Sequence, residues 1–184
     1  MIAAVILAAG SGTRMGGPKA LLTLQGESLL QRAVRLALEA GCQPVIAVVG
    51  AWDPGAVNPG ARIVRNPSTS EGMASSIRTG IAAVPLASDA ALLMTVDQPG
   101  VDAELLRSLL GLASAAPFRP AACAYADTVG VPAVLPRRLF PELLALEGDR
   151  GAKALLLREG AATLPFPQGA DDLDTPTDLA RLTR

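Results

Sequence analysis

The sequence predicts an α/β fold built on a doubly wound, mostly parallel sheet, and three observations support this prediction. Short apolar runs alternate with segments of helical spacing from the N-terminus to about residue 116. A glycine-rich loop directly follows the first apolar run. After Pro117 the alternation loosens, and turn residues alone separate two strand-like runs, which favours antiparallel pairing there. We therefore expect a mixed sheet that is mostly parallel.

The first part of the chain supplies most of the parallel elements. A buried strand is expected at Ala3–Ala8, and Ser28–Ala40 has the apolar spacing of a helix that ends at Gly41. The elements expected after these are strands at Val45–Val49 and Arg62–Arg65, a helix at Met73–Val84, a strand at Ala90–Val96, and a helix at Asp102–Ala113 with Asp102 as its N-cap.

The second part is expected to combine short strands with short helices. The predicted elements are strands at Ala121–Ala126 and Val131–Leu135, helices at Leu139–Leu146 and Ala152–Glu159, a strand at Ala162–Phe166, and a final helix capped by Thr175 with Pro176 in its first turn. No internal repeat, low-complexity tract or linker interrupts the 184 residues, so a single domain is predicted.

Composition excludes several classes of partner. Half of the residues are apolar and the net charge is −1, so no basic excess points to nucleic acid. No apolar run has the length of a membrane span, and the N-terminus has no signal-peptide pattern. Cys42 and Cys123 lack metal-type spacing and are predicted to be buried free thiols. We expect a cytoplasmic protein that binds neither nucleic acid nor membrane.

The chain contains no histidine. This absence excludes an imidazole base, a histidine-ligated metal and a Ser-His-Asp triad. Any chemistry must use carboxylates, arginine, lysine, hydroxyl groups and backbone groups.

The glycine-rich loop after the first strand has the chemistry of a polyphosphate cradle. Its four glycines, from Gly10 to Gly17, let backbone N–H groups approach a ligand, while Arg14 and Lys19 add positive charge. The loop is not a Walker A motif, because Pro18 precedes the lysine and no hydroxyl follows it. Its glycines are also spaced one residue too widely for the dinucleotide fingerprint. The alternative is a flexible connection without function.

Two aspartates are candidate magnesium ligands. Asp97 follows a buried strand at the edge of the sheet where such folds bind ligands. Its carboxylate is the hard oxygen ligand that Mg²⁺ prefers. Asp174 follows a second apparent strand and could supply another ligand. The alternatives are a turn or N-cap role for Asp97 and a capping role for Asp174.

Two further clusters are candidates for substrate contact. Asn66, Gly72, Ser75 and Ser76 flank the start of the helix near Met73 and could bind a base edge or a ribose, or could simply cap that helix. The charged turn Gly148–Lys153 could face a substrate, or could merely join two helices.

These motifs, taken together and in this order, resemble the MobA-like nucleotidyltransferase family, and the resemblance spans nearly the whole chain. The matching residues are Leu7–Gly16 with Lys19, Gly72 with Ser75–Ile77, Asp97–Pro99, Gly130–Pro132, Gly148–Ala152 and Asp172–Pro176.

The resemblance implies a Rossmann-like, three-layer α/β fold with a mostly parallel, mixed central sheet. Residues from 1 to about 116 would form the nucleotide-binding half, and residues from about 117 to 184 the acceptor-binding half. The chain is most similar to the molybdenum cofactor cytidylyltransferase branch, which transfers CMP from CTP to molybdenum-bound molybdopterin and releases pyrophosphate. Ala9 stands where the guanylyltransferase branch usually has glycine, and its methyl group would favour a pyrimidine.

The motif positions also imply roles for individual residues. Arg14, Lys19 and Asp97 would be catalytic, with Mg²⁺ as the cofactor held by Asp97 and Asp174. Nucleotide contacts would come from Leu7, Ala8, Ala9, Gly10, Ser11, Gly12, Arg14, Lys19, Asn66, Gly72 and Ser76. Acceptor contacts would come from Gln98, Pro99, Pro132 and Asp149. The partners would be a nucleoside triphosphate, a phosphorylated small molecule and, transiently, a molybdoenzyme or its chaperone.

Other functions remain open on the same fold, because a fold does not fix a function. The donor could be GTP, and the acceptor could be a sugar 1-phosphate or another phosphorylated metabolite such as methylerythritol phosphate. The chain could also be a nucleotide-binding sensor or a nicotinamide-dependent reductase. A sensor would keep its ligand without Asp97, and a reductase would work without magnesium.

Overall fold

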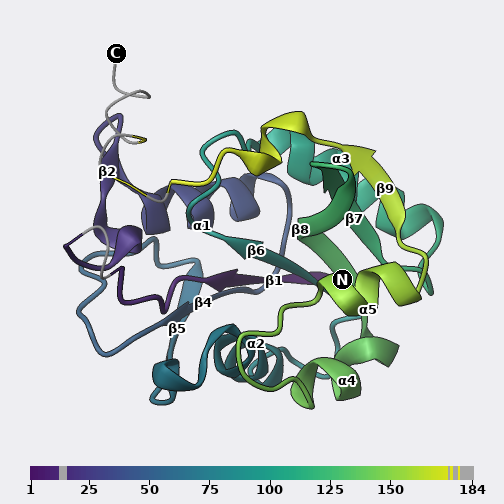
Figure 1. Cartoon of the computed structure of the whole chain (residues 1–184), viewed down its shortest axis with the longest axis horizontal. Coiled ribbons are helices and arrows are strands. Elements are labelled where there is room, and N and C mark those ends of the chain that lie inside the picture. The colour runs from purple at the N-terminus through teal and green to yellow at the C-terminus, as the bar shows by residue number, and fades with distance from the viewer. Residues whose placement is uncertain (13–15, 174, 176–177, 179–184) are drawn as a thin grey trace.

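A computed structural model describes residues 1–12, 16–173, 175 and 178 of the chain (Figure 1). Within these residues a seven-stranded sheet has the order β5-β4-β1-β6-β8-β7-β9. The strands are β1 (Ile2–Leu7), β4 (Val45–Val49), β5 (Ala61–Arg65), β6 (Ala90–Thr95), β7 (Ala121–Tyr125), β8 (Thr128–Pro136) and β9 (Ala162–Pro165).

The sheet is mostly parallel, as the sequence predicts. β1 pairs in parallel with β4 and β6, β4 with β5, and β7 with β9. Only β8 runs against its neighbours, since it pairs antiparallel with both β6 and β7. The carboxyl ends of six strands and the beginning of β8 therefore lie along one edge of the sheet.

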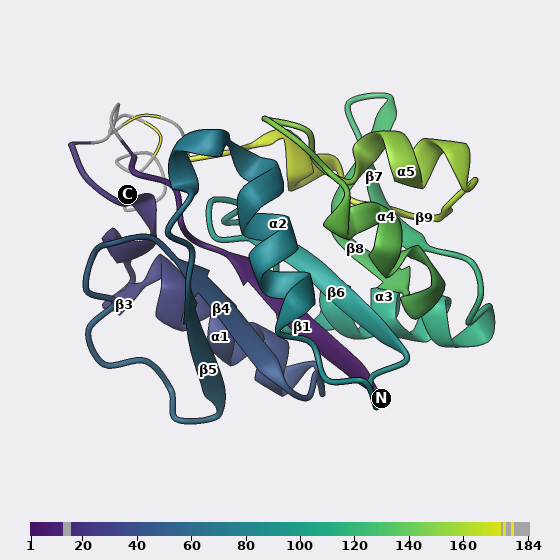
Figure 2. The same ribbon diagram turned by 90° about the horizontal axis from the view of Figure 1, so that it is seen from below.

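Helices cover both faces of the sheet and make three layers (Figures 1 and 2). On one face lie α1 (Leu29–Glu39) and α3 (Ala103–Ala115), and on the other lie α2 (Met73–Ala82), α4 (Phe140–Leu144) and α5 (Lys153–Arg158). Alternate residues of β1 serve the two cores, because side chains of a strand point to opposite faces. Ala4 and Ile6 pack with the α1 and α3 side, whereas Ala3, Val5 and Leu7 pack with the α2 side.

Local sequence explains where the longer helices begin. Ser28 caps α1 through a capping box, in which its Oγ accepts from the Gln31 N–H and its N–H donates to Gln31 Oε1. Asp102 caps α3 by accepting from the Leu105 N–H at 2.8 Å. None of the helices in the described part of the chain has the length and apolar content needed to cross a bilayer.

Several elements differ from the sequence prediction. The helix expected at Leu139–Leu146 is a 3-10 turn, Arg137–Leu139, followed by the short α4. β8 is longer than Val131–Leu135 because pairing with β7 extends it to Thr128. A 3-10 turn at Lys19–Leu21 and a two-stranded hairpin, β2 (Thr23–Leu24) and β3 (Glu27–Ser28), were not predicted. Strands of two residues leave no periodicity to detect. The helix expected after Thr175 falls outside the described residues.

Both cysteines are buried and free, which confirms the prediction. Burial raises the pKa of each thiol to about 12.

The buried thiols predict a pH dependence of stability. The unfolded chain, whose thiols have their ordinary pKa, loses these protons first, so the free energy of unfolding falls as pH rises from about 9 toward 12. By pH 10 we expect a loss of roughly 1–2 kcal/mol per thiol. Urea unfolding at pH 7.5 and at pH 10 measures this loss in the free energy of unfolding. A variant that carries both Cys42→Ala and Cys123→Ala should lose less free energy of unfolding between the two pH values. Equal losses in both proteins would contradict the assignment.

Candidate functional site

The predicted site residues lie mainly at the sheet edge where the parallel strands end. Leu7 ends β1, Asn66 follows β5, and Asp97 lies two residues after β6. The chain leaves β1 for α1 on one face and leaves β5 for α2 on the other, so a switch point of the sheet lies beside β1. Ligands of open α/β sheets bind at such a point.

The glycine loop begins as buried backbone and then turns back on itself. Ala8 and Ala9 are buried, and the Ala8 N–H donates to the Val48 carbonyl at 2.9 Å. Gly12 has a φ of +58°, and its carbonyl accepts from the Gly17 N–H at 3.2 Å. A Cβ on Gly12 would lie 1.8 Å from the Gly17 carbonyl oxygen, so only glycine fits this turn. Gly10 and Ser11 are exposed, and Arg14 lies outside the described residues.

Lys19 and Asp97 come together although 78 residues separate them. Lys19 Nζ lies 3.3 Å from Asp97 Oδ2, and the two side chains are only 22% and 25% exposed. Lys19 begins the 3-10 turn after the glycine loop, and Asp97 follows β6, the strand beside β1. A cation suited to phosphate and a carboxylate suited to a hard metal therefore share one place in the fold.

The C-terminal segment reaches the same place. The Leu173 N–H donates to the Asp97 carbonyl at 2.8 Å, and Leu173 is buried. This bond carries Asp171 and Asp172 toward the end of β6, while Asp174 itself is outside the described residues. Within those residues, no three histidine, cysteine or acidic side chains converge. Mg²⁺ commonly takes only one or two carboxylates, with water and phosphate completing its shell, so Asp97 fits such an ion.

Asn66 fastens the end of β5 to the start of α2. Its amide Nδ2 donates to Ser75 Oγ at 2.8 Å and to Ser76 Oγ at 3.0 Å, while its Oδ1 accepts from the Ser68 N–H. Asn66 and both serines are buried. The side-chain amide of Asn66 is thus engaged with protein groups, and these bonds fix the loop that leads to Gly72.

Gly72 and Asp149, predicted to contact nucleotide and acceptor respectively, are direct neighbours. Gly72 has a φ of +98°, and a Cβ there would lie 2.2 Å from Asp149 Oδ1. The Ala74 N–H donates to the Gly148 carbonyl at 3.0 Å, which holds this turn against the beginning of α2. Asp149 is exposed. The two predicted contacts therefore meet at one junction.

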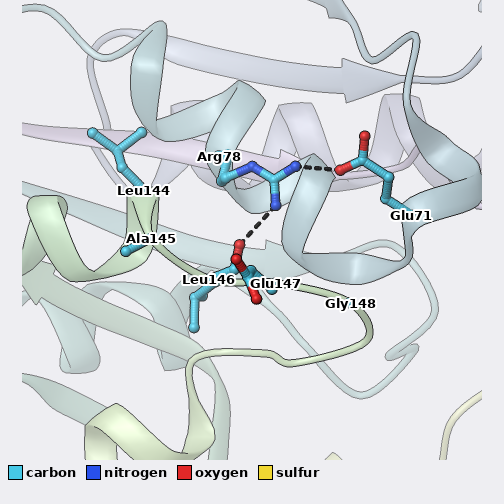
Figure 3. Close-up of a pocket in the computed structure, with 7 residues that line it drawn as sticks. All are labelled: Glu71, Arg78, Leu144, Ala145, Leu146, Glu147 and Gly148. Atoms are coloured by element: carbon cyan, nitrogen blue, oxygen red, sulfur yellow. Dashed lines mark hydrogen bonds and ion pairs between the residues drawn. The ribbon is translucent and has the colours of Figure 1, made fainter.

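A cavity of about 530 Å³ borders that junction (Figure 3). Its lining residues are Glu71, Arg78 and Leu144–Gly148. The Arg78 guanidinium donates to the Leu146 carbonyl at 2.7 Å and pairs with the Glu71 carboxylate. Arg78 thus connects α2 to the loop after α4, and Glu71 and Gly148 are the chain neighbours of Gly72 and Asp149.

The other predicted acceptor contacts are divided between the interior and the edge. Gln98 is 4% exposed, and its Nε2 donates to the Gly169 carbonyl at 3.0 Å. The Pro99 carbonyl accepts from the Arg32 guanidinium at 2.9 Å. Pro132 is buried within β8. Gln98 and Pro132 therefore lie inside the fold, and their contact with an acceptor stays a prediction.

Two residues beside these groups were missed by sequence reasoning. Arg32 of α1 also donates to the Val101 carbonyl, and burial, together with the nearby Arg35 charge, lowers its pKa. Tyr125 lies beside Gln98 at the end of β7, and burial is the main cause that raises its pKa. Tyr125 is the chain's only tyrosine, which is the one signal that the sequence offered.

Comparison with known proteins gives a family match over most of the chain. The model of the MobA-like NTP transferase domain matches residues 4–163. A nicotine blue oxidoreductase from Paenarthrobacter nicotinovorans is 37% identical, with 98% of this chain and 96% of that protein covered. A molybdenum cofactor guanylyltransferase from Rhodobacter capsulatus is 31% identical, with 98% and 94% covered.

A solved structure agrees with this match. The crystal structure of Rv0371c from Mycobacterium tuberculosis H37Rv has a TM-score of 0.85 and 31% identity, covering 99% of this chain and 97% of that one. Its complex with manganese has a TM-score of 0.76 and 29% identity over the same shares.

Proposed function

The chain belongs to the MobA-like NTP transferase family and is a nucleotidyltransferase, and we propose that it moves a nucleoside monophosphate from a triphosphate onto a phosphorylated acceptor. One observation carries the proposal: Lys19 Nζ and Asp97 Oδ2 lie 3.3 Å apart between the glycine loop and the end of β6. This pair gives a phosphate-binding cation and a metal-binding carboxylate in one position.

In the proposed reaction an oxygen of the acceptor phosphate attacks the α-phosphorus in line. A bond forms between them, and the bond to the leaving pyrophosphate breaks. Backbone N–H groups of Ala9–Gly12 and the side chains of Arg14 and Lys19 stabilise the charge of the triphosphate. Asp97, with Asp174 as second ligand, would hold Mg²⁺, which would supply further neutralisation of the phosphate charge.

The absence of histidine agrees with this reaction. A phosphate monoester has a second pKa of about 6, so the acceptor is already a nucleophile at neutral pH. No general base is required, and positioning with charge neutralisation supplies the acceleration.

Two nucleoside triphosphates, CTP and GTP, are candidates for the donor. The resemblance to the cytidylyltransferase branch favours CTP, with molybdenum-bound molybdopterin as acceptor. The Rhodobacter capsulatus relative is named a guanylyltransferase, which favours GTP. Ala9 is 4% exposed and packs in the core cluster beneath α2, so its methyl group presents little surface to a base.

Pyrophosphate release tests the proposal with CTP, GTP, ATP and UTP, each with molybdenum-bound molybdopterin, a sugar 1-phosphate or methylerythritol phosphate. We expect release that requires Mg²⁺ or Mn²⁺ and one phosphorylated acceptor. Lys19→Ala should lower turnover by roughly a hundredfold, because one stabilising donor is lost, with an unchanged circular dichroism spectrum. Absence of metal-dependent binding of all four nucleotides in calorimetry would refute the proposal, and normal turnover of Lys19→Ala would remove Lys19 from the cradle.

A second candidate is a nicotinamide-dependent reduction on the same fold. The relative named nicotine blue oxidoreductase, 37% identical over nearly the whole chain, favours it. A reductase would oxidise reduced nicotinamide without a divalent ion, and Asp97→Ala would leave that absorbance change intact.

We propose one domain, with residues from 1 to about 116 for the nucleotide and from about 117 to 184 for the acceptor, joined where β8 pairs with β6. The two free thiols favour the reducing cytoplasm. If molybdopterin is the acceptor, the product must pass to a molybdoenzyme or its chaperone.

A further inference from the structure

The segment after β9 crosses the carboxyl edge of the sheet from one side toward the other (Figure 1). It comprises Phe166, the 3-10 turn Pro167–Ala170, and Asp171–Leu173. Three attachments fix it, one at each stage of its path, and the last of them is at Asp97.

Phe166 makes the first attachment, to the end of β7. Its N–H donates to the Ala124 carbonyl at 2.9 Å. Its ring meets the Tyr125 ring edge to face, with centroids 6.2 Å apart and planes at 89°. Such ring pairs add stability beyond the area that they bury.

Gln98 makes the second attachment, through Gly169. Its Nε2 donates to the Gly169 carbonyl at 3.0 Å and lies 3.5 Å from the Tyr125 hydroxyl. That hydroxyl in turn donates to the Val131 carbonyl of β8 at 3.0 Å. A chain of hydrogen bonds thus links β8, the residue after Asp97, and the crossing segment.

The fit around Tyr125 is close on two sides. A Cβ on Gly169 would lie 2.4 Å from Tyr125 Cδ1, and a Cβ on Gly130 would lie 2.2 Å from the Tyr125 hydroxyl. The tyrosine therefore has a defined position between the crossing segment and β8, and both glycines are required for it.

The third attachment is the bond from the Leu173 N–H to the Asp97 carbonyl. It places the backbone of an acidic stretch, Asp171 and Asp172, beside Asp97, whose carboxylate pairs with Lys19. The charges of both Asp172 and Asp97 raise the pKa of Tyr125, after burial as the main cause, so both carboxylates act on this phenol.

We propose that Gln98 and Tyr125 are positioning residues that hold the segment Asp171–Leu173 at Asp97 and so set the metal affinity of the site. The inference rests on the proposed function for its catalytic consequence. It extends that function, because a hydrogen-bond chain from the acceptor-side strand β8 runs through Tyr125 and Gln98 to the segment whose end contacts the backbone carbonyl of Asp97.

Two variants test the inference in the full-length chain. Tyr125→Phe keeps the ring and deletes the hydroxyl, and Gln98→Leu deletes the donor to Gly169. Ser114→Ala is the matched control, since it also removes one hydroxyl, whose bond to the Leu110 carbonyl lies within α3. The readouts are hydrogen exchange of the backbone amides in 168–173, titration with Mn²⁺ followed by electron paramagnetic resonance, and the separate kcat and KM of pyrophosphate release.

Tyr125→Phe is expected to raise amide exchange in 168–173 roughly three- to tenfold, since the hydroxyl's bonds to Gln98 and Val131 are lost, and to weaken Mn²⁺ binding by a similar factor. In kinetics kcat should fall while the KM for nucleotide stays within about twofold, because the cradle is unchanged. Gln98→Leu should act in the same direction, and Ser114→Ala should change none of these readouts.

Unchanged exchange in both variants would show that Gln98 and Tyr125 do not hold the segment in place. Raised exchange with unchanged Mn²⁺ affinity would show that the held segment does not set the metal affinity. If Gln98→Leu does not fold, Tyr125→Phe alone decides. A wild-type chain that releases no pyrophosphate would refute the proposed function instead, since exchange and Mn²⁺ binding do not depend on turnover.

Discussion

Replacing Asp97 by asparagine is expected to abolish metal-dependent transfer, with a loss of turnover of roughly a thousandfold or more. The substitution removes the negative charge that faces Lys19 at 3.3 Å but keeps the shape of the side chain. The backbone carbonyl of residue 97 still accepts from Leu173, so the C-terminal segment keeps that attachment. Pyrophosphate release as a function of Mg²⁺ concentration measures the effect.

Asp102→Asn is the matched control for this variant. It makes the same change five residues further along the chain, at the N-cap of α3. Asparagine caps helices about as well as aspartate, so turnover should stay within about twofold. Full metal-dependent activity of Asp97→Asn would remove Asp97 from the metal site, and equal losses in both variants would point to a general structural effect.

Gly12→Ala is expected to weaken nucleoside triphosphate binding by roughly a hundredfold while the fold persists. The new Cβ would lie 1.8 Å from the Gly17 carbonyl oxygen and 2.9 Å from the backbone nitrogen of Lys19. The φ of residue 12 is +58°, which strains any residue other than glycine. The backbone must move, which breaks the bond between Gly17 and Gly12 and displaces Lys19. Calorimetry with nucleotide and Mg²⁺ measures the affinity, and thermal unfolding checks the fold.

Gly17→Ala separates this effect from a general loss of flexibility in the loop. A Cβ at Gly17 meets nothing within 4 Å, and its φ is not in the left-handed region. Its affinity for nucleotide should stay within about threefold of the wild-type value. Wild-type affinity in Gly12→Ala, or an equal loss in both variants, would show that the turn at Gly12 does not shape the cradle.

Much of the fold could be predicted from sequence because its signals are local. Val45–Val49 is a continuous apolar run, and the structure gives the strand those bounds. The caps at Ser28 and Asp102 are also local. The rule that parallel strands end at one edge placed Lys19 and Asp97 on the same side of the sheet, and their side chains do meet. Their chemical roles stay predictions.

The parts that sequence could not predict depend on contacts between distant residues. Gln98 and Gly169 are 71 residues apart, and nothing local indicates that an amide would be buried to hold a glycine carbonyl. Gly72 and Asp149 become neighbours only because the loop after α4 packs against the beginning of α2. The hairpin β2–β3 depends on a two-residue turn, Gln25–Gly26, in which both φ angles are positive. Glutamine is not among the residues typical of the first position of such a turn, so the sequence did not indicate it.

The reversed direction of β8 bears on how such enzymes diversify. Because β8 opposes β6 and β7, the tight turn at Ala126–Asp127 opens onto the rim that carries the glycine loop. Residues grafted into that turn would extend this rim within the part of the chain proposed for the acceptor, without changing the register of any strand. The same fold could thus take a new acceptor through changes in this one turn, while the nucleotide-binding half stays the same.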